Sequence, residues 1–290
     1  MPIPEARIGI SFERIMLATD FSPAATVALE YAVGLSRRFS STLEIVNVID
    51  LSATTLAFDV VLQTTLQSMR YTDEEVLGDL ARGIRGIKVR TKVMEGFQPS
   101  ALLVGEATHS DSDLIVAGTS SKHGLDRITL GSIAEEIIRK APCPVLTIGA
   151  HVGKPADGPI SFRRIVYATD FSPEAAKAHD IAFSLAEGDG AEIFLCHVIK
   201  DKDASKQEDS DTKPLDSLRA LIPGNARMCR PECVVEHGKA AEAILGLAAR
   251  VQADLIVLGA RKSSFWLTFV KQGLTPSLLA EARCPVLTVC

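Results

Sequence analysis

The chain has 290 residues, of which 47% are apolar and 23% charged, and its formal net charge is −5 at pH 7. This length suffices for two domains that each bury a core, while the acidic balance disfavours sequence-independent nucleic-acid binding, which needs a basic surface. No apolar run reaches the roughly 18–20 residues of a membrane span, and residues 1–14 lack the apolar segment of a signal peptide. We therefore expect a cytoplasmic protein without nucleic-acid or membrane partners.

Short apolar runs alternate with segments of helical spacing along the first half of the chain. The first run, 14–19, ends at Asp20, and Pro23 opens a helix expected at 24–38. Further strands are predicted at 43–48, 87–94, 114–117 and 145–148, and further helices at about 65–82, 99–108 and 131–140. This alternation predicts parallel strands covered on both faces, wound by right-handed crossovers into a five-stranded, doubly wound (Rossmann-like) α/β sheet.

The opening segment returns 150 residues later. Residues 11–25 and 161–175 are identical at eleven of fifteen positions. Cys143–Thr147 returns as Cys284–Thr288 and Asp113–Gly118 returns as Asp254–Gly259, both at an offset of 141. The chain is thus predicted to be a tandem duplication, whose second copy has lost about nine residues net between its first strand and Asp254.

The two copies are predicted as domains at 1–150 and 161–290, joined by a Pro- and Gly-containing linker at 151–160. A charged segment at 200–213 is predicted to be a solvated, mobile loop. The strands expected in the second copy are 164–169, 191–198, 228–235, 255–258 and 286–289.

The six cysteines are not expected to form disulfides, because a cytoplasmic chain with two full cores needs none. Cys229, Cys233 and His237 have a C-x3-C-x3-H spacing that could bind a metal. Zinc sites usually use four ligands and thiols two residues apart, and Cys233 lies in a strand-like run. A structural role is therefore favoured, and no metal site is predicted.

In a doubly wound sheet, ligands bind at the carboxyl ends of the strands, where the strand order reverses. In the first copy the residues at these ends are 18–20 after the first strand, 48–50 after the second and 117–118 after the fourth. After Gly118 the chain passes Ser121 and reaches Gly131-Ser132 at a predicted helix start, whose free N–H groups and dipole favour an anion. The intervening residues Lys122, His123 and Arg127 can add positive charge. This arrangement favours a phosphate-bearing ligand.

With these motifs, both halves resemble the universal stress protein family in its tandem two-domain form. ATP-binding members of that family carry G-x2-G-x9-G-[S/T] after the fourth strand and an early aspartate that recognises the nucleoside. The resemblance implies ATP, ADP or AMP as the cofactor, with Mg²⁺ as an optional companion. It implies that Thr19, Asp20 and Val48 surround adenosine, that Gly118, Gly131, Ser132 and Ile133 lie near ribose and phosphates, and that Ala18, Ala117 and Ser121 complete the site.

Ser121 departs from the family pattern, because it stands at the second glycine. If that position has φ > 0, a side chain costs roughly 1–2 kcal/mol, whereas its hydroxyl could replace a backbone contact, so weakened binding is expected. The chain has no Walker-type phosphate loop.

The second copy departs further from the family pattern. Gly259 is followed by 260–262 without a second glycine, and Gly273 is followed by Leu274. The apolar stretch 265–270, which contains Trp266, is predicted to fill this copy's crevice. Asp170 survives, but capping of the helix that follows is the alternative role for it and for Asp20.

A cytoplasmic stress-response binding or signalling protein, with an adenine nucleotide in the first domain, is therefore favoured. An enzyme, such as a slow ATPase or a nucleotidyl transferase, is less favoured because His123 is the only titratable candidate base near Gly131-Ser132. A nucleotide-free interaction protein is the third reading, and Ser121 supports it. The last strands, 145–148 and 286–289, are expected to pair within the chain as an intramolecular pseudo-dimer, with a homodimer as an alternative.

Overall fold

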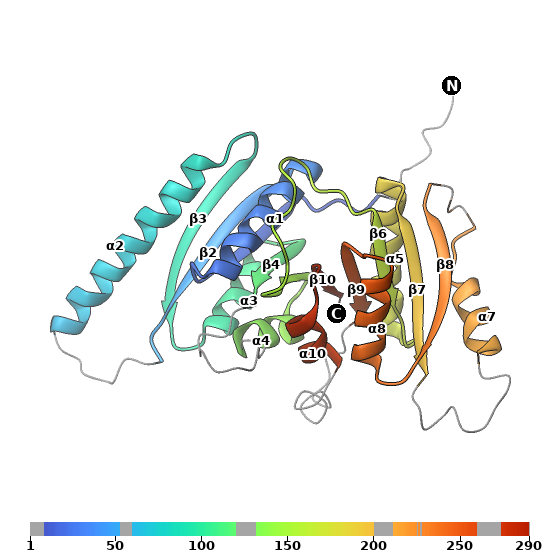
Figure 1. The fold of residues 1–290 in the computed structure, drawn as a ribbon. Helices are drawn as coiled ribbons and strands as arrows, with labels where there is room; N and C mark the ends of the chain where they lie inside the picture. Colours follow the sequence, from blue (N-terminus) through green and yellow to red (C-terminus); the bar gives the residue numbers. More distant parts are fainter. Residues whose placement is uncertain are drawn as a thin grey trace. The chain divides into compact units, whose positions relative to one another are not determined.

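The computed structural model describes residues 9–52, 60–119, 132–199, 211–224, 226, 228–259 and 274–289. Helices and strands alternate through both repeats (Figure 1). The chain divides into two compact units: the first contains Phe12–Ile160 together with the C-terminal helix and strand as far as Thr288, and the second contains Ser161–Gly259. No helix among the described residues is long and apolar enough to cross a membrane.

The first repeat forms five parallel strands in the order β3-β2-β1-β4-β5. The strands are β1 (Arg14–Thr19), β2 (Thr42–Asp50), β3 (Lys88–Gly96), β4 (Leu114–Gly118) and β5 (Val145–Ile148). The helices are α1 (Pro23–Phe39), α2 (Val60–Gly83), α3 (Pro99–His109) and α4 (Ser132–Lys140). Right-handed crossovers place α1 and α2 on one face of the sheet and α3 and α4 on the other. The predicted doubly wound α/β sheet is confirmed.

The second unit repeats this order as β9-β6-β7-β8, again with parallel neighbours. Its strands are β6 (Arg164–Ala168), β7 (Glu192–Ile199), β8 (Arg230–His237) and β9 (Leu255–Gly259). Its helices are α5 (Pro173–Asp189), α7 (Thr212–Ala220) and α8 (Ala240–Arg250).

The last two elements of the chain, α10 (Leu274–Glu281) and β10 (Val286–Val289), group with the first unit. β10 runs antiparallel to β5, with Leu287 opposite Leu146. Thr147 Oγ1 donates to the Val286 carbonyl at 3.0 Å, and Thr288 Oγ1 donates to the Val145 carbonyl at 3.2 Å. The predicted pairing of the last strands is confirmed, and it covers an edge that would otherwise expose unpaired backbone groups.

The helix after each first strand begins with the same capping chemistry. Ser22 Oγ accepts from the Ala25 N–H at 3.2 Å, and Ser172 Oγ accepts from the Ala175 N–H at 3.3 Å. In both repeats a proline directly follows the serine. A serine N-cap satisfies a free amide, and proline at the first helical position has none to satisfy. The repeated Phe-Ser-Pro sequence therefore sets where α1 and α5 begin.

The segment between the repeats is anchored to α1 rather than free. The Ile160 N–H donates to the Gly34 carbonyl at 3.3 Å, and Lys154 pairs with Glu30 at 2.5 Å. A Cβ added at Gly34 would lie 2.6 Å from Ile160 Cγ1. The absence of a side chain at Gly34 in α1 thus leaves room for the buried Ile160 side chain to pack against this helix. The composition of the linker did not reveal this contact.

The net deletion in the second repeat falls where α7 replaces the much longer α2. α2 begins at Val60, earlier than predicted, and α7 begins at Thr212, inside the segment predicted to be a loop. Residues 200–210 of that segment lie outside the described residues.

Candidate functional site

The strand order of the first repeat reverses between β1 and β4. β1 lies between β2 and β4, and Ala18 is in register with Val46 on one side and Ala117 on the other. The carboxyl ends of the three strands therefore lie side by side, which brings the 18–20 segment, Val48 and Gly118 to one edge of the sheet. At this edge Asp20 is exposed, whereas Ala18, Thr19, Val48 and Gly118 are half-buried. Ala117, one residue before Gly118, is buried.

The loop after β1 is held by its own side chains. Thr19 Oγ1 accepts from the Phe21 N–H at 3.1 Å, and Asp20 Oδ1 accepts from the Ser22 N–H at 3.0 Å. Phe21 has φ = 60°, a left-handed conformation that costs roughly 1–2 kcal/mol for a residue with a side chain. Ser22, not Asp20, is the N-cap of α1. The loop thus presents the Asp20 carboxylate at the exposed edge of the sheet.

The second repeat builds the same loop. The Phe171 N–H donates to Thr169 Oγ1 and the Ser172 N–H donates to Asp170 Oδ1, each at 3.0 Å, and Phe171 again has φ = 60°. The loop conformation is therefore a property of the repeated Thr-Asp-Phe-Ser-Pro sequence.

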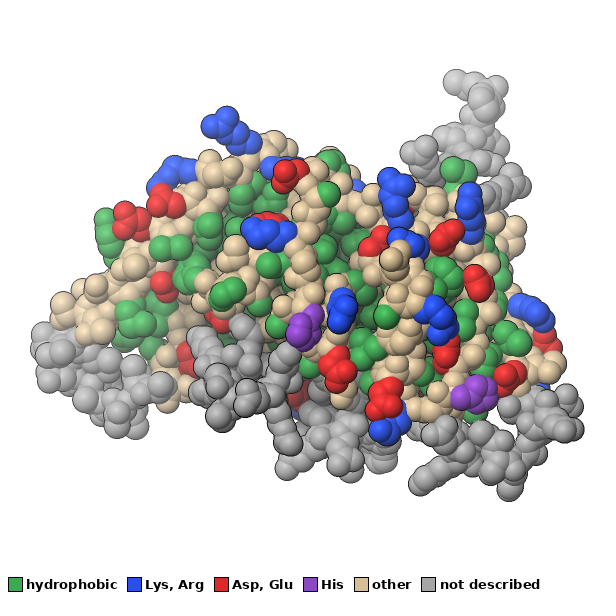
Figure 2. All heavy atoms as spheres, in the orientation of Figure 1, with side chains coloured by type: hydrophobic (Ala, Val, Ile, Leu, Met, Phe, Trp, Pro, Cys, Tyr) green, Lys and Arg blue, Asp and Glu red, His purple; other side chains and the backbone are tan. Residues whose placement is uncertain are grey.

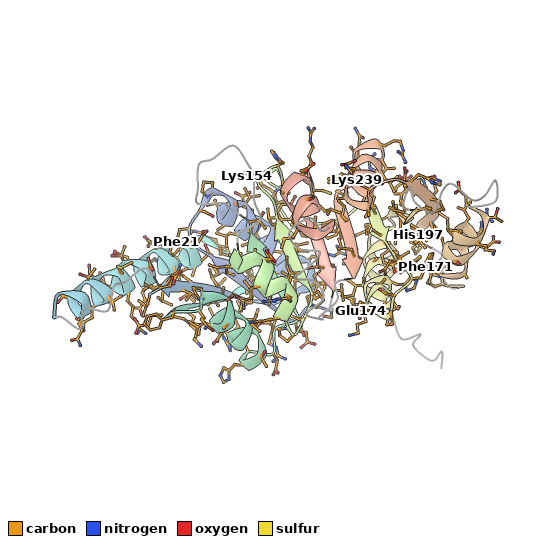
Figure 3. The ribbon with its side chains drawn as sticks, turned by 90° about the horizontal axis from the view of Figure 1, so that it is seen from below. Phe21, Lys154, Phe171, Glu174, His197 and Lys239 are labelled. Carbon is orange, nitrogen blue, oxygen red and sulfur yellow. The ribbon has the colours of Figure 1, made fainter. Side chains whose placement is uncertain are left out.

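Sequence reasoning missed one position that supports this loop in both repeats. Asn47 on β2 donates from Nδ2 to the Thr19 carbonyl at 3.0 Å. His197, the matching residue on β7, lies with Nδ1 2.9 Å from the Thr169 carbonyl, and its ring centroid is 4.7 Å from that of Phe171 (Figure 3). The available signal was a polar residue at the same repeat position inside two apolar strands.

Gly118 and Gly259 are required by packing. A Cβ at Gly118 would lie 2.6 Å from the Ala24 carbonyl carbon, and one at Gly259 would lie 2.5 Å from the Ala175 amide nitrogen. Real Cβ atoms do not approach backbone this closely, so only glycine lets β4 and β9 end against the first turns of α1 and α5. The first glycine of the motif therefore has a structural role in both repeats.

Helix α4 begins at Ser132, as the Gly-Ser pattern predicted. Ile133 in its first turn is exposed. Ser100 Oγ on α3 donates to Glu136 Oε2 at 2.5 Å, and Lys140 Nζ donates to Glu136 Oε1. The hydrogen bond from Lys140, followed by that from Ser100, lowers the pKa of Glu136 below its ordinary value. The bond from Ser100 ties α4 to α3, whereas the bond from Lys140 lies within α4.

Several predicted site residues lie outside the described residues: Ser121, Gly131, Lys122, His123 and Arg127. The structure places Ala18, Thr19, Asp20, Val48, Ala117, Gly118, Ser132 and Ile133. The apolar stretch 265–270 of the second repeat also lies outside the described residues, while α10 begins at Leu274.

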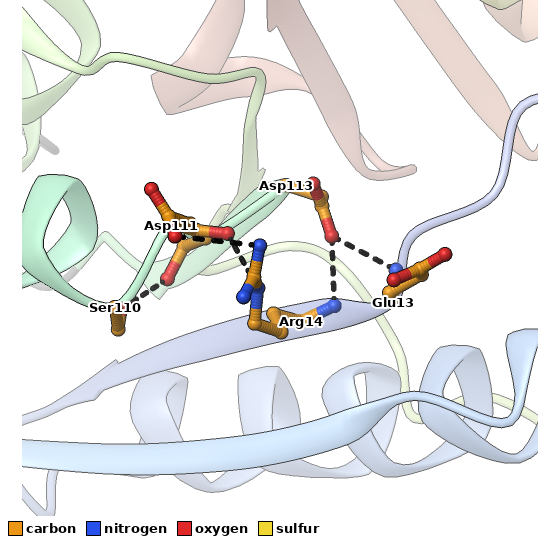
Figure 4. A network of polar contacts seen from close by, with 6 residues as sticks. Glu13, Arg14, Ser110, Asp111 and Asp113 are labelled. Atoms are coloured by element: carbon orange, nitrogen blue, oxygen red, sulfur yellow. Dashed lines mark hydrogen bonds and ion pairs between the residues drawn. The ribbon is translucent and has the colours of Figure 1, made fainter.

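The opposite, amino edge of the sheet is also built alike in both repeats. Asp113 Oδ2 accepts from the N–H groups of Glu13 and Arg14 at 2.9 and 2.8 Å (Figure 4). Asp254 accepts from the N–H groups of Arg163 and Arg164, through Oδ2 at 2.8 Å and Oδ1 at 3.2 Å. Burial raises the pKa of Asp254 despite these hydrogen bonds. Each aspartate fixes the start of its repeat's first strand.

A depression of about 300 Å³ lies at this amino edge in the second unit, lined by Arg163, Arg164, Asp189, Gly190, Glu192 and Arg230. Its carboxylates are already engaged, because Asp189 Oδ2 accepts from the Phe162 N–H at 2.7 Å and Glu192 lies 3.8 Å from Arg230. Acidic and basic side chains are also intermixed over the face drawn in Figure 2.

The cysteine and histidine residues of the C-x3-C-x3-H pattern have other surroundings. His237 Nε2 lies 3.0 Å from Asp211 Oδ1. Burial, followed by a hydrogen bond to Glu187, raises the pKa of Cys229 to about 12, and burial raises that of Cys233. Within the described ranges, no three His, Cys, Asp or Glu side chains are grouped as metal ligands.

Two doubly wound α/β repeats, each with an aspartate loop at the point where its strand order reverses, define a tandem protein of the Rossmann-like class. The model of the Universal stress protein family matches residues 11–149 and again residues 161–289. The chain therefore belongs to the universal stress protein family and carries two copies of its domain.

Known proteins agree with this assignment. A universal stress protein of Methanocaldococcus jannaschii is 31% identical over 140 residues, which is 47% of this chain and 82% of the relative. A putative universal stress protein of Staphylococcus aureus (strain USA300) is 32% identical over 145 residues, 48% of this chain and 85% of the relative. The crystal structure of a universal stress protein from Archaeoglobus fulgidus DSM 4304 shares the fold across 97% of both chains, with a TM-score of 0.77 and 23% identity.

Proposed function

We propose that this chain is a cytoplasmic stress-response binding protein that holds ATP, ADP or AMP at the carboxyl edge of its first repeat. One observation carries the proposal. Asp20 stands exposed where the strand order reverses, next to the ends of β2 and β4, and the sequence between Gly118 and α4 keeps the Gly-Ser helix start. A carboxylate can accept hydrogen bonds from a ribose, and a helix start attracts phosphates.

Nucleotide is proposed for the first repeat alone. At the matching place in the second repeat α10 begins at Leu274, and no Gly-Ser pair precedes it. Ser100 and Glu136, which fix α4 to α3, are replaced by Ala241 and Ser277 at the 141-residue offset.

Binding, rather than hydrolysis, is proposed because the site offers few groups for catalysis. The segment 119–131 contains His123 as its single histidine and Asp126 as its single carboxylate, so it lacks the paired acidic residues that usually hold a catalytic metal ion. Mg²⁺ is proposed only as a companion of bound ATP.

The test is calorimetric titration of the full chain with ATP, ADP and AMP, with and without Mg²⁺. Gly131→Asp sets a negative charge against the phosphates at the helix start and should abolish binding. Gln272→Asp, at the matching position of the second repeat, is the control and should bind as the native chain does. Absence of binding for all three nucleotides, with none released from the denatured purified protein by mass spectrometry, would instead support the nucleotide-free reading.

A further inference from the structure

The loop that carries Asp20 is supported from the neighbouring strand by one buried side chain. Asn47 is 5% exposed and lies in register with Thr19 across the β1–β2 pair. Its Nδ2 donates to the Thr19 carbonyl at 3.0 Å. This carbonyl sits one residue before Asp20, where the chain leaves the strand and turns into the left-handed Phe21.

The second repeat provides the same bond with a different side chain. The Thr169 carbonyl can only accept, so His197 Nδ1, 2.9 Å away, carries the proton and donates. The amide of Asn47 and the imidazole of His197 differ in shape and chemistry, but each places an N–H donor within hydrogen-bond distance of the threonine carbonyl. The donor to the threonine carbonyl is therefore the feature that both repeats keep.

We propose that Asn47 is a positioning residue of the nucleotide site, which holds the Thr19–Ser22 loop in the conformation that presents Asp20. The role of Asn47 in nucleotide binding rests on the proposed function. Its role in holding the loop rests on the two matched hydrogen bonds, from Asn47 and from His197. Without the donor, the Thr19 carbonyl loses its hydrogen bond to Asn47, and the loop that leads into the strained Phe21 is no longer tied to β2 at this point.

The chemistry of Asn47 also predicts which substitutions are tolerated. Its Oδ1 is buried and has no hydrogen-bond partner among the described residues. An aspartate in its place would turn a carboxylate toward the Thr19 carbonyl, acceptor against acceptor. Histidine, which occupies the equivalent place in the second repeat, restores the donor.

The experiment compares Asn47→Leu, Asn47→His and Asn47→Asp with the native full chain, and uses His197→Asn as the control in the other repeat. ATP affinity is measured by calorimetry, and exchange of the Phe21 and Ser22 amides is measured by NMR without nucleotide. We expect Asn47→Leu to weaken ATP binding about tenfold, the equivalent of one lost hydrogen bond, and to speed exchange of both amides. Asn47→His should have native ATP affinity and native amide exchange. Asn47→Asp should bind ATP more weakly and exchange faster than Asn47→Leu, and His197→Asn should leave ATP binding unchanged.

Native affinity and native amide exchange in Asn47→Leu would overturn the positioning role while leaving the proposed function intact. If the native chain binds no nucleotide, the proposed function fails, and the amide exchange still decides whether Asn47 holds the loop. If Asn47→Leu does not fold, Asn47→His decides: weak binding and fast exchange in a folded histidine variant would overturn the proposal.

Discussion

The two repeats have nearly the same first loop and the same amino edge, but they differ after their fourth strands. Thr19–Ser22 and Thr169–Ser172 make the same hydrogen bonds, and Asp113 and Asp254 hold the starts of β1 and β6 alike. The sequences differ after Gly118 and Gly259: the first repeat has Gly131-Ser132 at the start of its next helix, whereas the second has Gly273-Leu274. Both repeats keep the aspartate loop and its folding contacts, so the Gly131-Ser132 helix start, found in the first repeat alone, is the better candidate for what confines binding to that repeat.

The largest expected effect follows from this difference. Asp20→Ala should abolish ATP binding, because it removes the carboxylate from the reversal point of the first sheet. Asp170→Ala removes the equivalent carboxylate from the second repeat and should leave the ATP affinity unchanged. Calorimetry on the two variants checks this. Equal losses in both would show that the repeats share the binding function, which would break the comparison.

The two packing glycines should instead behave alike. Gly118→Ala pushes a Cβ into the first turn of α1, and Gly259→Ala pushes one into the first turn of α5. Each should lower the free energy of unfolding by about 2–4 kcal/mol. Gly105→Ala in α3 meets no atom within 4 Å and should be neutral or stabilising by up to about 1 kcal/mol. Urea denaturation measures all three, and a harmless Gly118→Ala would contradict the close contact between β4 and α1.

The amino-edge aspartates should also behave alike, with smaller effects. Asp113→Ala and Asp254→Ala each remove the acceptor for two backbone N–H groups, and each should cost about 1–2 kcal/mol of unfolding free energy. ATP binding by Asp113→Ala, once the protein is folded, should be unchanged because the aspartate lies at the opposite end of β1. Loss of binding without loss of stability would place Asp113 in the site.

The smallest effect concerns the anchor of α4, which the second repeat lacks. The pKa of Glu136 is lowered in the folded state, so its ionised form contributes stability above its ordinary pKa, and this contribution is lost as the pH falls through the lowered value. Glu136→Gln should therefore be less stable by a few tenths of a kcal/mol near about pH 7, with the difference closing as the pH falls below the ordinary pKa of a glutamate.

The neighbouring Glu135 is the control for this pH dependence. Burial raises its pKa, so its charge is disfavoured in the folded state, and Glu135→Gln should not destabilise the protein at neutral pH. Thermal unfolding of both variants across this pH range measures the difference. A constant effect of Glu136→Gln at every pH would contradict an electrostatic anchor.

Much of the fold could be predicted from the spacing of apolar residues along the chain and from the internal repeat. The bounds of β1, β5 and β10 agree with the predicted runs to the residue, since buried parallel strands are short apolar segments between turn signals. The early start of α2 and the presence of α7 were missed, because both helices are largely exposed and have weak apolar patterns.

The candidate site was predictable only in part. Asp20 and Gly118 stand at the ends of recognisable strands, so the edge that they share followed from the predicted topology. Asn47 and the contact of Ile160 with Gly34 depend on which side chains meet across elements, which spacing along the chain does not encode. The sequence alone also could not separate the packing role of Gly118 from a role in binding, because both require glycine.

The central claim is that one repeat binds nucleotide and the other does not. The most direct measurement is the stoichiometry of ATP binding to the full chain, by calorimetry at saturating protein concentration. We expect about one ATP per chain, with all binding lost in Gly131→Asp. Two ATP per chain, or one ATP that survives Gly131→Asp and is lost in Asp170→Ala, would contradict it.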